Sequence, residues 1–380
     1  LYIPRKFSIH SASMTRPFFL KLVVPLLAIT LVAAACGDDD DTSSAEGTEE
    51  AAEETAPAIY DGECVEATGT SVTVYSGRTE NLMEPVFDAF ECETGIGYEV
   101  RWGDADELAL LLQEEGDRTS ADVYLSNSPG PIGFLESEGL IATLDASVLD
   151  LVEEQNRSSQ GTWVGFTGRK RVLVYNVDNV SDDELPASVF ELTDAVYNDR
   201  VAIPADNGSF KDWFTVFRDQ YGNDVAAEWL DDMVANGAEP YANNRAIVEA
   251  VGRGEIDMGL VNHYYNYQEA AAIGDDHRAL NHDFDPDDIG SLLIITAATV
   301  TTASEKPTES TALVGYLLSD GAQRYFTEET FEYPLAQGVK PAAILPPLDA
   351  LEIGTVDYDS LSGGLEETNA IIEASGILNE

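Results

Sequence analysis

The stretch Ile256-Asp-Met-Gly-Leu-Val-Asn-His-Tyr-Tyr-Asn-Tyr-Gln268 contains the change from strand to helix around which the rest of the chain is arranged. Residues 256–261 are a strand-like run, and the residues from Gln268 onward are typical of a helix. In open α/β sheets, ligands bind at the carboxyl ends of strands. Successive side chains of a strand point to opposite faces, so leaving the strand lets the rings of Tyr264 and Tyr265 turn to one side. The stretch therefore predicts a binding site with two neighbouring phenols.

Two phenol oxygens that converge on one point suit a hard, highly charged cation. An ordinary tyrosine has a pKa of about 10 and is a poor ligand for weakly charged ions. A trivalent cation such as Fe³⁺ can be the largest local charge and displace the phenol protons. The alternative is an aromatic pair that packs in a cleft or stacks on an organic ligand, and the dipeptide alone favours this alternative.

The composition is that of a globular protein with an extreme negative charge. The chain has 380 residues, which is enough for two domains of ordinary size, and 44% of them are hydrophobic. Its formal net charge is -50. Binding to a phosphate backbone requires a basic face, so nucleic-acid binding is excluded, as is docking on anionic lipid through a basic patch. The acidic surface is interpreted as a solubility device that also attracts cations.

The first 35 residues have the pattern of a secretory signal peptide with a short upstream extension. After Met14 comes a charged segment and then an apolar run over residues 22–32, which is too short and wrongly flanked for a membrane span. Small residues lead to Cys36, as in the bacterial lipobox, although Ala replaces the usual Leu three residues before it. We expect residues 36–68 to be a lipidated cysteine and an acidic, disordered tether. The mature protein would then be anchored by lipid to the outer face of the cytoplasmic membrane.

Cys64 and Cys92 lie in the part of the chain that is expected to fold. An exported protein passes through an oxidising compartment that permits a disulfide between them. Such a bridge would tie the lead-in segment to the end of the first helix. The alternative is two unpaired cysteines, and the sequence alone leaves both open.

Strands and helices alternate along residues 71–327 in two similar runs, which predicts parallel strands with covering helices. Because the chain leaves each run and later returns to it, we expect two lobes. One consists of residues 69–171 with 295–346, and the other of residues 172–294 with 347–380. The predicted strands cover residues 71–75, 98–102, 121–125, 163–175, 201–204, 256–261 and 291–302. The predicted helices include residues 81–93, 105–115, 225–235, 311–318 and 322–327, with others after residue 210 and before residue 252. The strand-end loops expected to line the cleft are 76–80, 126–129, 206–210, 242–245 and 262–267.

Several short segments are each a weak sign of a protein family, but together and in this order along the chain they are a specific one. They are Val74-Tyr-Ser-Gly-Arg78, Gly95-Ile96, Glu114-Glu-Gly116, Ser120-Ala-Asp-Val123, Gly168-Arg-Lys-Arg-Val-Leu-Val-Tyr-Asn176, Pro240-Tyr-Ala-Asn-Asn244, Gly254-Glu-Ile-Asp257, Asn262-His-Tyr-Tyr265 and Glu332-Tyr-Pro-Leu335. On these segments, residues 70–375 resemble the periplasmic ferric-ion-binding proteins, the substrate-binding components of iron ABC transporters. The resemblance implies a type II periplasmic-binding-protein clamshell, an α/β fold whose two mixed, mostly parallel sheets carry covering helices and are joined by hinge strands.

The resemblance also implies that Tyr264 and Tyr265 supply phenolate oxygens to Fe³⁺. The chain departs from the family at the other ligands. Thr79 and Glu80 stand where members often have His or Tyr, Asn127 stands where some have Glu, and the loop 206–209 lacks the third Tyr of others. Glu80 is a candidate third ligand, because it is a carboxylate in the first cleft loop. Its alternative is a solvated acid at the start of a helix.

In the family, a synergistic anion such as phosphate or carbonate completes the coordination of iron. Backbone N–H groups and amides suit this role, because they neutralise an anion without competing for the metal, and a helix N-terminus favours negative charge. The candidate anion contacts are Arg78, Asn207, Gly208, Ser209, Asn244 and Asn262.

The resemblance implies a binding protein that captures Fe³⁺ outside the membrane and delivers it to an ABC permease and ATPase complex, and we expect a monomer. The alternative is the same fold carrying an organic cation such as a polyamine or thiamine, on which the tyrosines would stack. An enzyme is not expected, because no nucleophile elbow, phosphate-binding glycine loop or His-Glu-x-x-His motif is found. His263 is expected to point away from the cleft and form a local hydrogen bond.

Overall fold

Residues 59–348 and 364–379 are described by the computed structural model of the chain. The predicted signal peptide, Cys36 and most of the acidic tether lie outside the described residues. In the described part, strands and helices alternate as the sequence predicts. The strands are β1 (Ser71–Ser76), β2 (Gly97–Trp102), β3 (Val123–Ser126), β4 (Trp163–Asn176), β5 (Val201–Ile203), β6 (Glu239–Pro240), β7 (Met258–Asn262), β8 (Ala279–His282), β9 (Leu293–Val300) and β10 (Tyr333–Pro334).

The helices begin and end where local signals predict. Asp104 caps α2, because its side chain accepts hydrogen bonds from the N–H groups of Asp106 and Glu107. Gly95 ends α1 in the left-handed conformation that favours glycine. The helices are α1 (Glu80–Thr94), α2 (Ala105–Glu115), α3 (Pro129–Ser137), α4 (Ala146–Leu149), α5 (Gly208–Tyr221), α6 (Asn223–Ala235), α7 (Asn244–Gly252), α8 (His263–Ile273), α9 (Pro307–Tyr316), α10 (Asp320–Glu328) and α11 (Leu365–Ser375).

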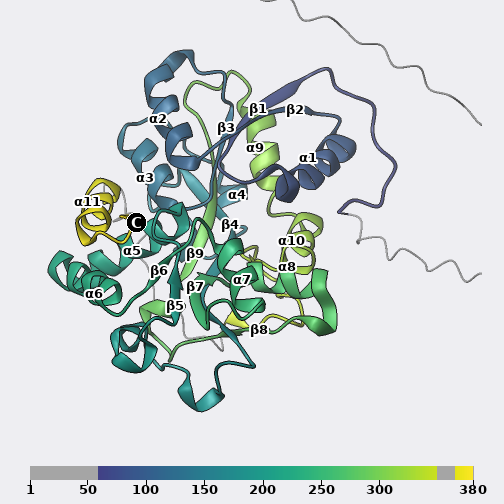
Figure 1. Ribbon diagram of the computed structural model, residues 1–380. Helices are drawn as coiled ribbons and strands as arrows, with labels where there is room; N and C mark the ends of the chain where they lie inside the picture. Colours follow the sequence, from purple (N-terminus) through teal and green to yellow (C-terminus); the bar gives the residue numbers. More distant parts are fainter. Residues whose placement is uncertain (1–58, 349–363, 380) are drawn as a thin grey trace, which may run out of the picture. The chain divides into compact units, whose positions relative to one another are not determined.

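The described strands form a mixed sheet with the order β2-β1-β3-β9-β4-β7-β5-β6, and β8 and β10 pair with β4. β1 runs parallel to β2 and β3, and β5 runs parallel to β6 and β7. β9 and β4 are antiparallel to each other and to their outer neighbours. The parallel pairs that the sequence predicts therefore lie toward the two ends of this order, and the long strands β9 and β4 join them (Figure 1).

β4 changes its partner in the middle of its length. Residues 163–170 pair with β9, whereas residues 171–175 pair with β7. All residues of β4 are buried, including the charged residues Arg169, Lys170 and Arg171. Because side chains alternate along a strand, Arg169 and Arg171 lie on one face and Lys170 on the other. The strand shared by both parts of the sheet thus carries two buried guanidinium groups on the same face.

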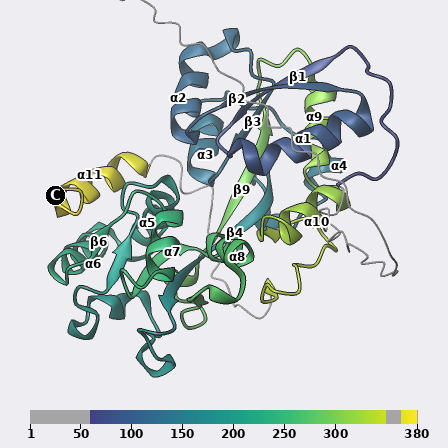
Figure 2. The same cartoon turned by 45° about the vertical axis from the view of Figure 1, so that its right-hand side comes forward.

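The apolar side of α5 holds its N-terminus, and the loop before it, in a fixed position. Phe210, Trp213, Phe214 and Phe217 are fully buried and pack against one another, with ring centroids 5.3–6.3 Å apart. The C-terminal helix α11 packs on the other side of α5 and on α6 (Figure 2). The first turn of α5 is therefore supported by a rigid aromatic cluster.

Residues 59–68, which the composition places in the disordered tether, are fixed to the end of α1. A disulfide joins Cys64 to Cys92, and the N–H groups of Val65 and Thr68 donate hydrogen bonds to the carbonyl oxygens of Cys92 and Gly95. The physical reason is that the disulfide and the backbone hydrogen bonds offset the entropy cost of ordering this segment. Its polar composition alone would not offset that cost. Of the residues that the structure describes, none belongs to a helix with the length and apolarity needed to cross a bilayer.

Candidate functional site

The paired tyrosines lie just after the end of a strand, as the sequence predicts, but they belong to a helix and not to a loop. β7 ends at Asn262 and α8 begins at His263, five residues before the predicted helix start at Gln268, so the predicted loop 262–267 is wrong. The rings of Tyr264 and Tyr265 stack with their centroids 4.2 Å apart, so both phenols turn to one side. Tyr264 is only 3% exposed, whereas Tyr265 is partly exposed and has the guanidinium of Arg245 over its ring at 5.6 Å.

Burial determines the protonation of Tyr264. Desolvation, followed by the neighbouring Tyr265, raises the pKa of the Tyr264 phenol well above its usual value. The charges of Arg78 and Arg169 act in the opposite direction and lower this pKa, but they do not overcome the burial. Without a bound cation, the Tyr264 phenol is therefore protonated at neutral pH.

His263 holds the strand end in place and does not join the tyrosine pair as a charged group. Its Nδ1 accepts a hydrogen bond of 3.0 Å from the backbone N–H of Lys170, and its ring stacks on Tyr333 at 4.9 Å. Burial lowers the pKa of His263 to about 3, so the imidazole is neutral. The hydrogen bond joins His263 to a residue 93 positions away, so it is made across strands and not within the local chain as expected.

The predicted anion contacts of the second half of the sheet come together around Arg171. The Arg171 guanidinium donates to the carbonyl oxygen of Ser209 at 2.6 Å and to Asn244 Oδ1 at 3.2 Å. Asn244 Oδ1 also accepts from the backbone N–H of Asn262 at 2.9 Å, and Asn244 Nδ2 donates to Asn207 Oδ1 at 3.0 Å. The end of β7, the start of α7 and the start of α5 thus form one polar network.

Two positions in this network remain open to a ligand. Gly208 is the first residue of α5, and a Cβ atom added to it would have no neighbour within 4 Å. The Oδ1 atom of Asn262 is buried and has no hydrogen-bond partner among the described residues. The N–H groups of Ser209, Phe210 and Lys211 already donate to Asn207, so an anion beside Gly208 would not meet a free row of first-turn donors.

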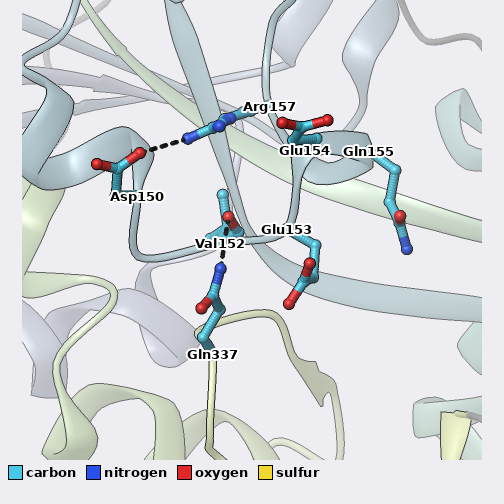
Figure 3. A pocket seen from close by; sticks show the side chains of 7 residues that line it. All are labelled: Asp150, Val152, Glu153, Glu154, Gln155, Arg157 and Gln337. Carbon is cyan, nitrogen blue, oxygen red and sulfur yellow. Dashed lines mark hydrogen bonds and ion pairs between the residues drawn. The ribbon is translucent and has the colours of Figure 1, made fainter.

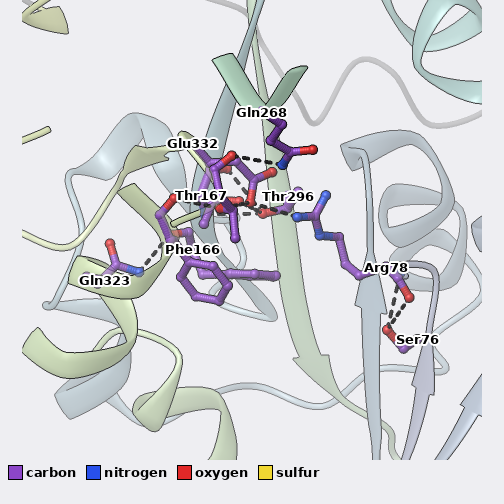
Figure 4. Close-up of polar contacts among 10 residues, drawn as sticks. Ser76, Arg78, Phe166, Thr167, Gln268, Thr296, Gln323 and Glu332 are labelled. Atoms are coloured by element: carbon purple, nitrogen blue, oxygen red, sulfur yellow. Dashed lines mark hydrogen bonds and ion pairs between the residues drawn. The ribbon is translucent and has the colours of Figure 1, made fainter. Parts of the chain in front are cut away.

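Arg78 is less available to an anion than the sequence predicts, because a carboxylate neutralises it. Its Nη2 lies 2.7 Å from Glu332 Oε2, and both side chains are buried (Figure 4). Thr330 donates a second hydrogen bond to the same oxygen at 3.2 Å. Burial opposes the charge of Arg78, but Glu332 and the two tyrosines overcome it and raise the pKa of Arg78. Arg78 therefore stays charged beside the tyrosine pair.

Glu80 is exposed in the first turn of α1, next to the N-terminus of that helix. This is the position of the solvated helix-start acid that was the alternative to a metal ligand. Thr79 before it is exposed as well. Among the described contacts, none joins Glu80 to Tyr264 or Tyr265. Arg78, two residues earlier, differs because its charge interacts with both tyrosines.

Four buried charged residues of the site region were not identified from the sequence. Arg169, Arg171 and Glu332 interact with the tyrosine pair, and Asp212 interacts with the two arginines. A usable signal was present, because Gly168-Arg-Lys-Arg171 places three basic residues in the middle of a predicted strand of a very acidic chain. Charged residues are almost never fully buried without a partner or a ligand. In the sequence, this run contributes only to the family resemblance.

Asp212 on α5 brings a carboxylate to the first turn of α3. A Cβ atom added at Gly130 would lie 3.6 Å from Asp212 Oδ1. Burial, and next the charge of Asp106 on α2, raise the pKa of Asp212 to about 7. The hydroxyl of Ser128 and the charges of Arg169 and Arg171 act in the opposite direction. Asp212 is therefore only partly ionised at neutral pH and neutralises the two arginines incompletely.

A surface pocket of the described structure lies elsewhere and contains none of the predicted site residues. Its lining includes Asp150, Glu153, Glu154 and Arg157, and Arg157 is paired with Asp150 at 3.1 Å (Figure 3). Gln337 closes another side by donating to the carbonyl oxygen of Val152. The pocket offers mainly acidic side chains, and its one cation is already neutralised.

Comparison with known proteins identifies the family. Residues 118–358 match the family model of bacterial extracellular solute-binding proteins. The major ferric iron-binding protein of Neisseria meningitidis is 30% identical over 312 residues, which cover 80% of this chain and 93% of that protein. This chain belongs to the periplasmic ferric-iron-binding protein family. The Fe(3+)-binding periplasmic protein of Serratia marcescens is 29% identical over 293 residues, which cover 77% of this chain and 86% of that protein.

A solved structure of a ferric-binding family member has the same fold. Iron-bound HitA from Pseudomonas aeruginosa aligns with a TM-score of 0.77 and 30% identity, and the match covers 81% of this chain and 99% of HitA. The described fold is therefore the type II periplasmic-binding fold, as expected. Members of the ferric-binding family are solute-binding components that work with ABC transporter permeases, and they are not enzymes.

Proposed function

We propose that this chain captures Fe³⁺ outside the cytoplasmic membrane and that Tyr264 and Tyr265 bind the ion as phenolates. The single observation that supports this most strongly is the stacked phenol pair just after a strand end, with one ring buried and the charges of three buried arginines acting on the pair. Burying two ionised phenols without a cation would be very costly. Binding a trivalent ion removes this cost, because the metal replaces the two protons.

The arginines favour an iron–anion assembly over an organic cation that enters without an anion. A polyamine or thiamine would enter a site next to Arg78, Arg169 and Arg171, and only Arg78 has a carboxylate within ion-pair distance among the described residues. Like charges in a buried site repel strongly. A ferric ion bound by two phenolates carries one residual positive charge, which an accompanying anion would neutralise. We propose phosphate or carbonate for this role, in contact with Asn207, Gly208, Ser209, Asn244 and Asn262 and facing Arg78.

The test is iron loading followed by visible absorption. Iron-free protein titrated with ferric nitrilotriacetate in phosphate buffer is expected to develop a visible band, because phenolate bound to Fe³⁺ absorbs visible light. The pKa of Tyr264 is raised, so loading releases its proton, and affinity should fall as the pH is lowered. Each phenol that loses a proton on loading contributes about a tenfold change in affinity per pH unit. Stoichiometric iron without a visible band would contradict phenolate binding.

We further propose that the mature chain begins at Cys36, carries lipid there, and passes iron to an ABC permease and ATPase complex. The lobes would be residues 69–171 with 295–346 and residues 172–294 with 347–380, and the change of partner in β4 at residues 170–171 agrees with this division. Intact-mass analysis of protein from the membrane fraction is expected to give the mass of a chain starting at Cys36 plus acyl groups. A soluble mature form with an unmodified Cys36 would contradict this.

A further inference from the structure

Arg245 covers one face of the Tyr265 ring. Its guanidinium carbon Cζ lies over this ring, 5.6 Å from the ring centroid. The ring of Tyr264 stacks against Tyr265 with the centroids 4.2 Å apart, so it occupies one face of that ring. Because two groups cannot fill the same face, the guanidinium covers the other one. The Tyr265 ring is therefore enclosed on both faces, and a ligand can approach it only along its edge, where the phenol oxygen lies.

The Arg245 guanidinium is held in this position by α8, the helix that carries the tyrosines. Its Nη2 donates a hydrogen bond of 2.9 Å to Gln268 Oε1, and its Nη1 lies 3.8 Å from Glu269 Oε2. Gln268 is fixed in turn, because its amide donates to the carbonyl oxygen of Thr330 at 3.3 Å (Figure 4). An arginine side chain that is 46% exposed has much rotamer freedom when nothing holds it. These contacts restrict that freedom and keep the charge over Tyr265.

The backbone of Arg245 is also fixed relative to the tyrosines. Arg245 is the second residue of α7, and the buried Asn244 before it accepts a hydrogen bond of 2.9 Å from the backbone N–H of Asn262. Asn262 is the last residue of β7 and directly precedes α8. α7 and α8 also pack against each other (Figure 1). The start of α7, which carries the guanidinium, is therefore bonded to the start of α8, which carries the ring.

We infer that Arg245 is a positioning residue for the iron-binding phenolate of Tyr265. It keeps the ring stacked on Tyr264 with only the oxygen edge open, and its charge stabilises the electrons of the bound phenolate. A cation over an aromatic face is attracted by the ring, and the attraction grows when the ring itself carries negative charge. The inference rests on the proposed function, because it concerns the phenolate that binds Fe³⁺. It gives a role to an exposed residue that contacts the ring and not the iron.

The charge of Arg245 has a spectroscopic consequence. The visible band of an iron–phenolate complex arises when an electron passes from the phenolate to Fe³⁺. A positive charge over the ring lowers the energy of the phenolate electrons, so the transition requires more energy. Removing this charge should therefore move the band to longer wavelength. A residue that only stabilises the fold would leave the band where it is.

The experiment compares iron-loaded Arg245→Gln and Arg245→Lys with the parent. Arg245→Gln loses the charge, so its band is expected at longer wavelength. Excess EDTA should remove its iron roughly three- to tenfold faster, the range of a cation–π contact combined with an exposed charge pair. Arg245→Lys keeps the charge but loses the planar group, so both effects should be smaller. Arg253→Gln, at an exposed arginine that follows α7 and pairs with Glu249 and Glu255, is the matched control and should behave as the parent does.

The melting temperature of the iron-free protein separates positioning from folding. Arg245 is exposed and its ion pair with Glu269 is long, so Arg245→Gln should lower this temperature only slightly. A band that stays in place in Arg245→Gln, with or without a lower melting temperature, would overturn the inference while the proposed function stands. An Arg245→Lys band shifted as far as that of Arg245→Gln would overturn it too, because the charge would then not be the cause. A parent that loads no iron, or loads it without a visible band, refutes phenolate binding and this inference with it.

Discussion

Replacing Tyr264 by Phe is expected to remove most of the visible band of the iron-loaded protein and to weaken Fe³⁺ binding by at least roughly 100-fold. The magnitude follows because even outer partners of a metal site typically contribute 10–100-fold in affinity, and Tyr264 is proposed to contact the metal directly. Tyr265→Phe is expected to have a similar effect, since the two rings stack at 4.2 Å and present their phenols together. Phe keeps the ring volume, so folding should be preserved.

The matched control is Tyr267→Phe, one turn further along α8. The ring of Tyr267 packs against Phe331 with centroids 5.9 Å apart, and we assign it no metal contact. This variant should load iron with the parent's affinity and colour. Glu80→Gln should have a smaller effect than either change of the pair, because Glu80 is exposed. If both Tyr264→Phe and Tyr265→Phe keep the band, the phenolate hypothesis is wrong, and the organic-cation alternative would have to be reconsidered.

Replacing Glu332 by Gln is expected to destabilise the protein by roughly 3–5 kcal/mol, the usual cost of removing one partner of a buried ion pair. Glu332 is 0% exposed and neutralises Arg78, which is 4% exposed. The neutral amide has nearly the same shape, so the loss comes from an uncompensated buried cation and not from a cavity. Denaturant unfolding of the iron-free protein should show a lower midpoint with an unchanged slope.

Two further variants show whether the ion pair is the cause. Arg78→Met combined with Glu332→Gln removes the orphaned cation and should recover most of the lost stability, because an apolar replacement of a buried pair is often neutral. Glu255→Gln removes an exposed carboxylate paired with Arg253 and should leave the midpoint where it is in the parent. A double variant that is as unstable as Glu332→Gln alone would show that Glu332 acts through other contacts, such as its hydrogen bond from Thr330.

The sequence alone was sufficient for the features that depend on local pattern. The periodicity of residues 71–115 predicts β1, α1, β2 and α2, and the structure has them within a few residues. The change from β7 to α8 could be predicted because an apolar run ends at an Asn-His pair and an Ala-rich segment follows. That the rings of Tyr264 and Tyr265 stack at 4.2 Å is known only from the structure, because neighbouring side chains of a helix are about 100° apart. The class of fold and the family were predictable for the same reason, since motifs in order along the chain carry them.

Only the tertiary structure decided which charges surround the tyrosines. Glu332 lies 254 positions after Arg78, and no local pattern predicts that the two meet at 2.7 Å. The sequence does not distinguish Arg169 and Arg171 from exposed strand residues. In the structure, β4 is buried along its whole length between β9, β7, β8 and β10, and both arginines are buried with it. Burial and long-range proximity are properties of the folded chain, because they depend on which distant segments share a sheet. The phenol pair can therefore be predicted from the sequence. The buried arginines around it come together only when the strands assemble.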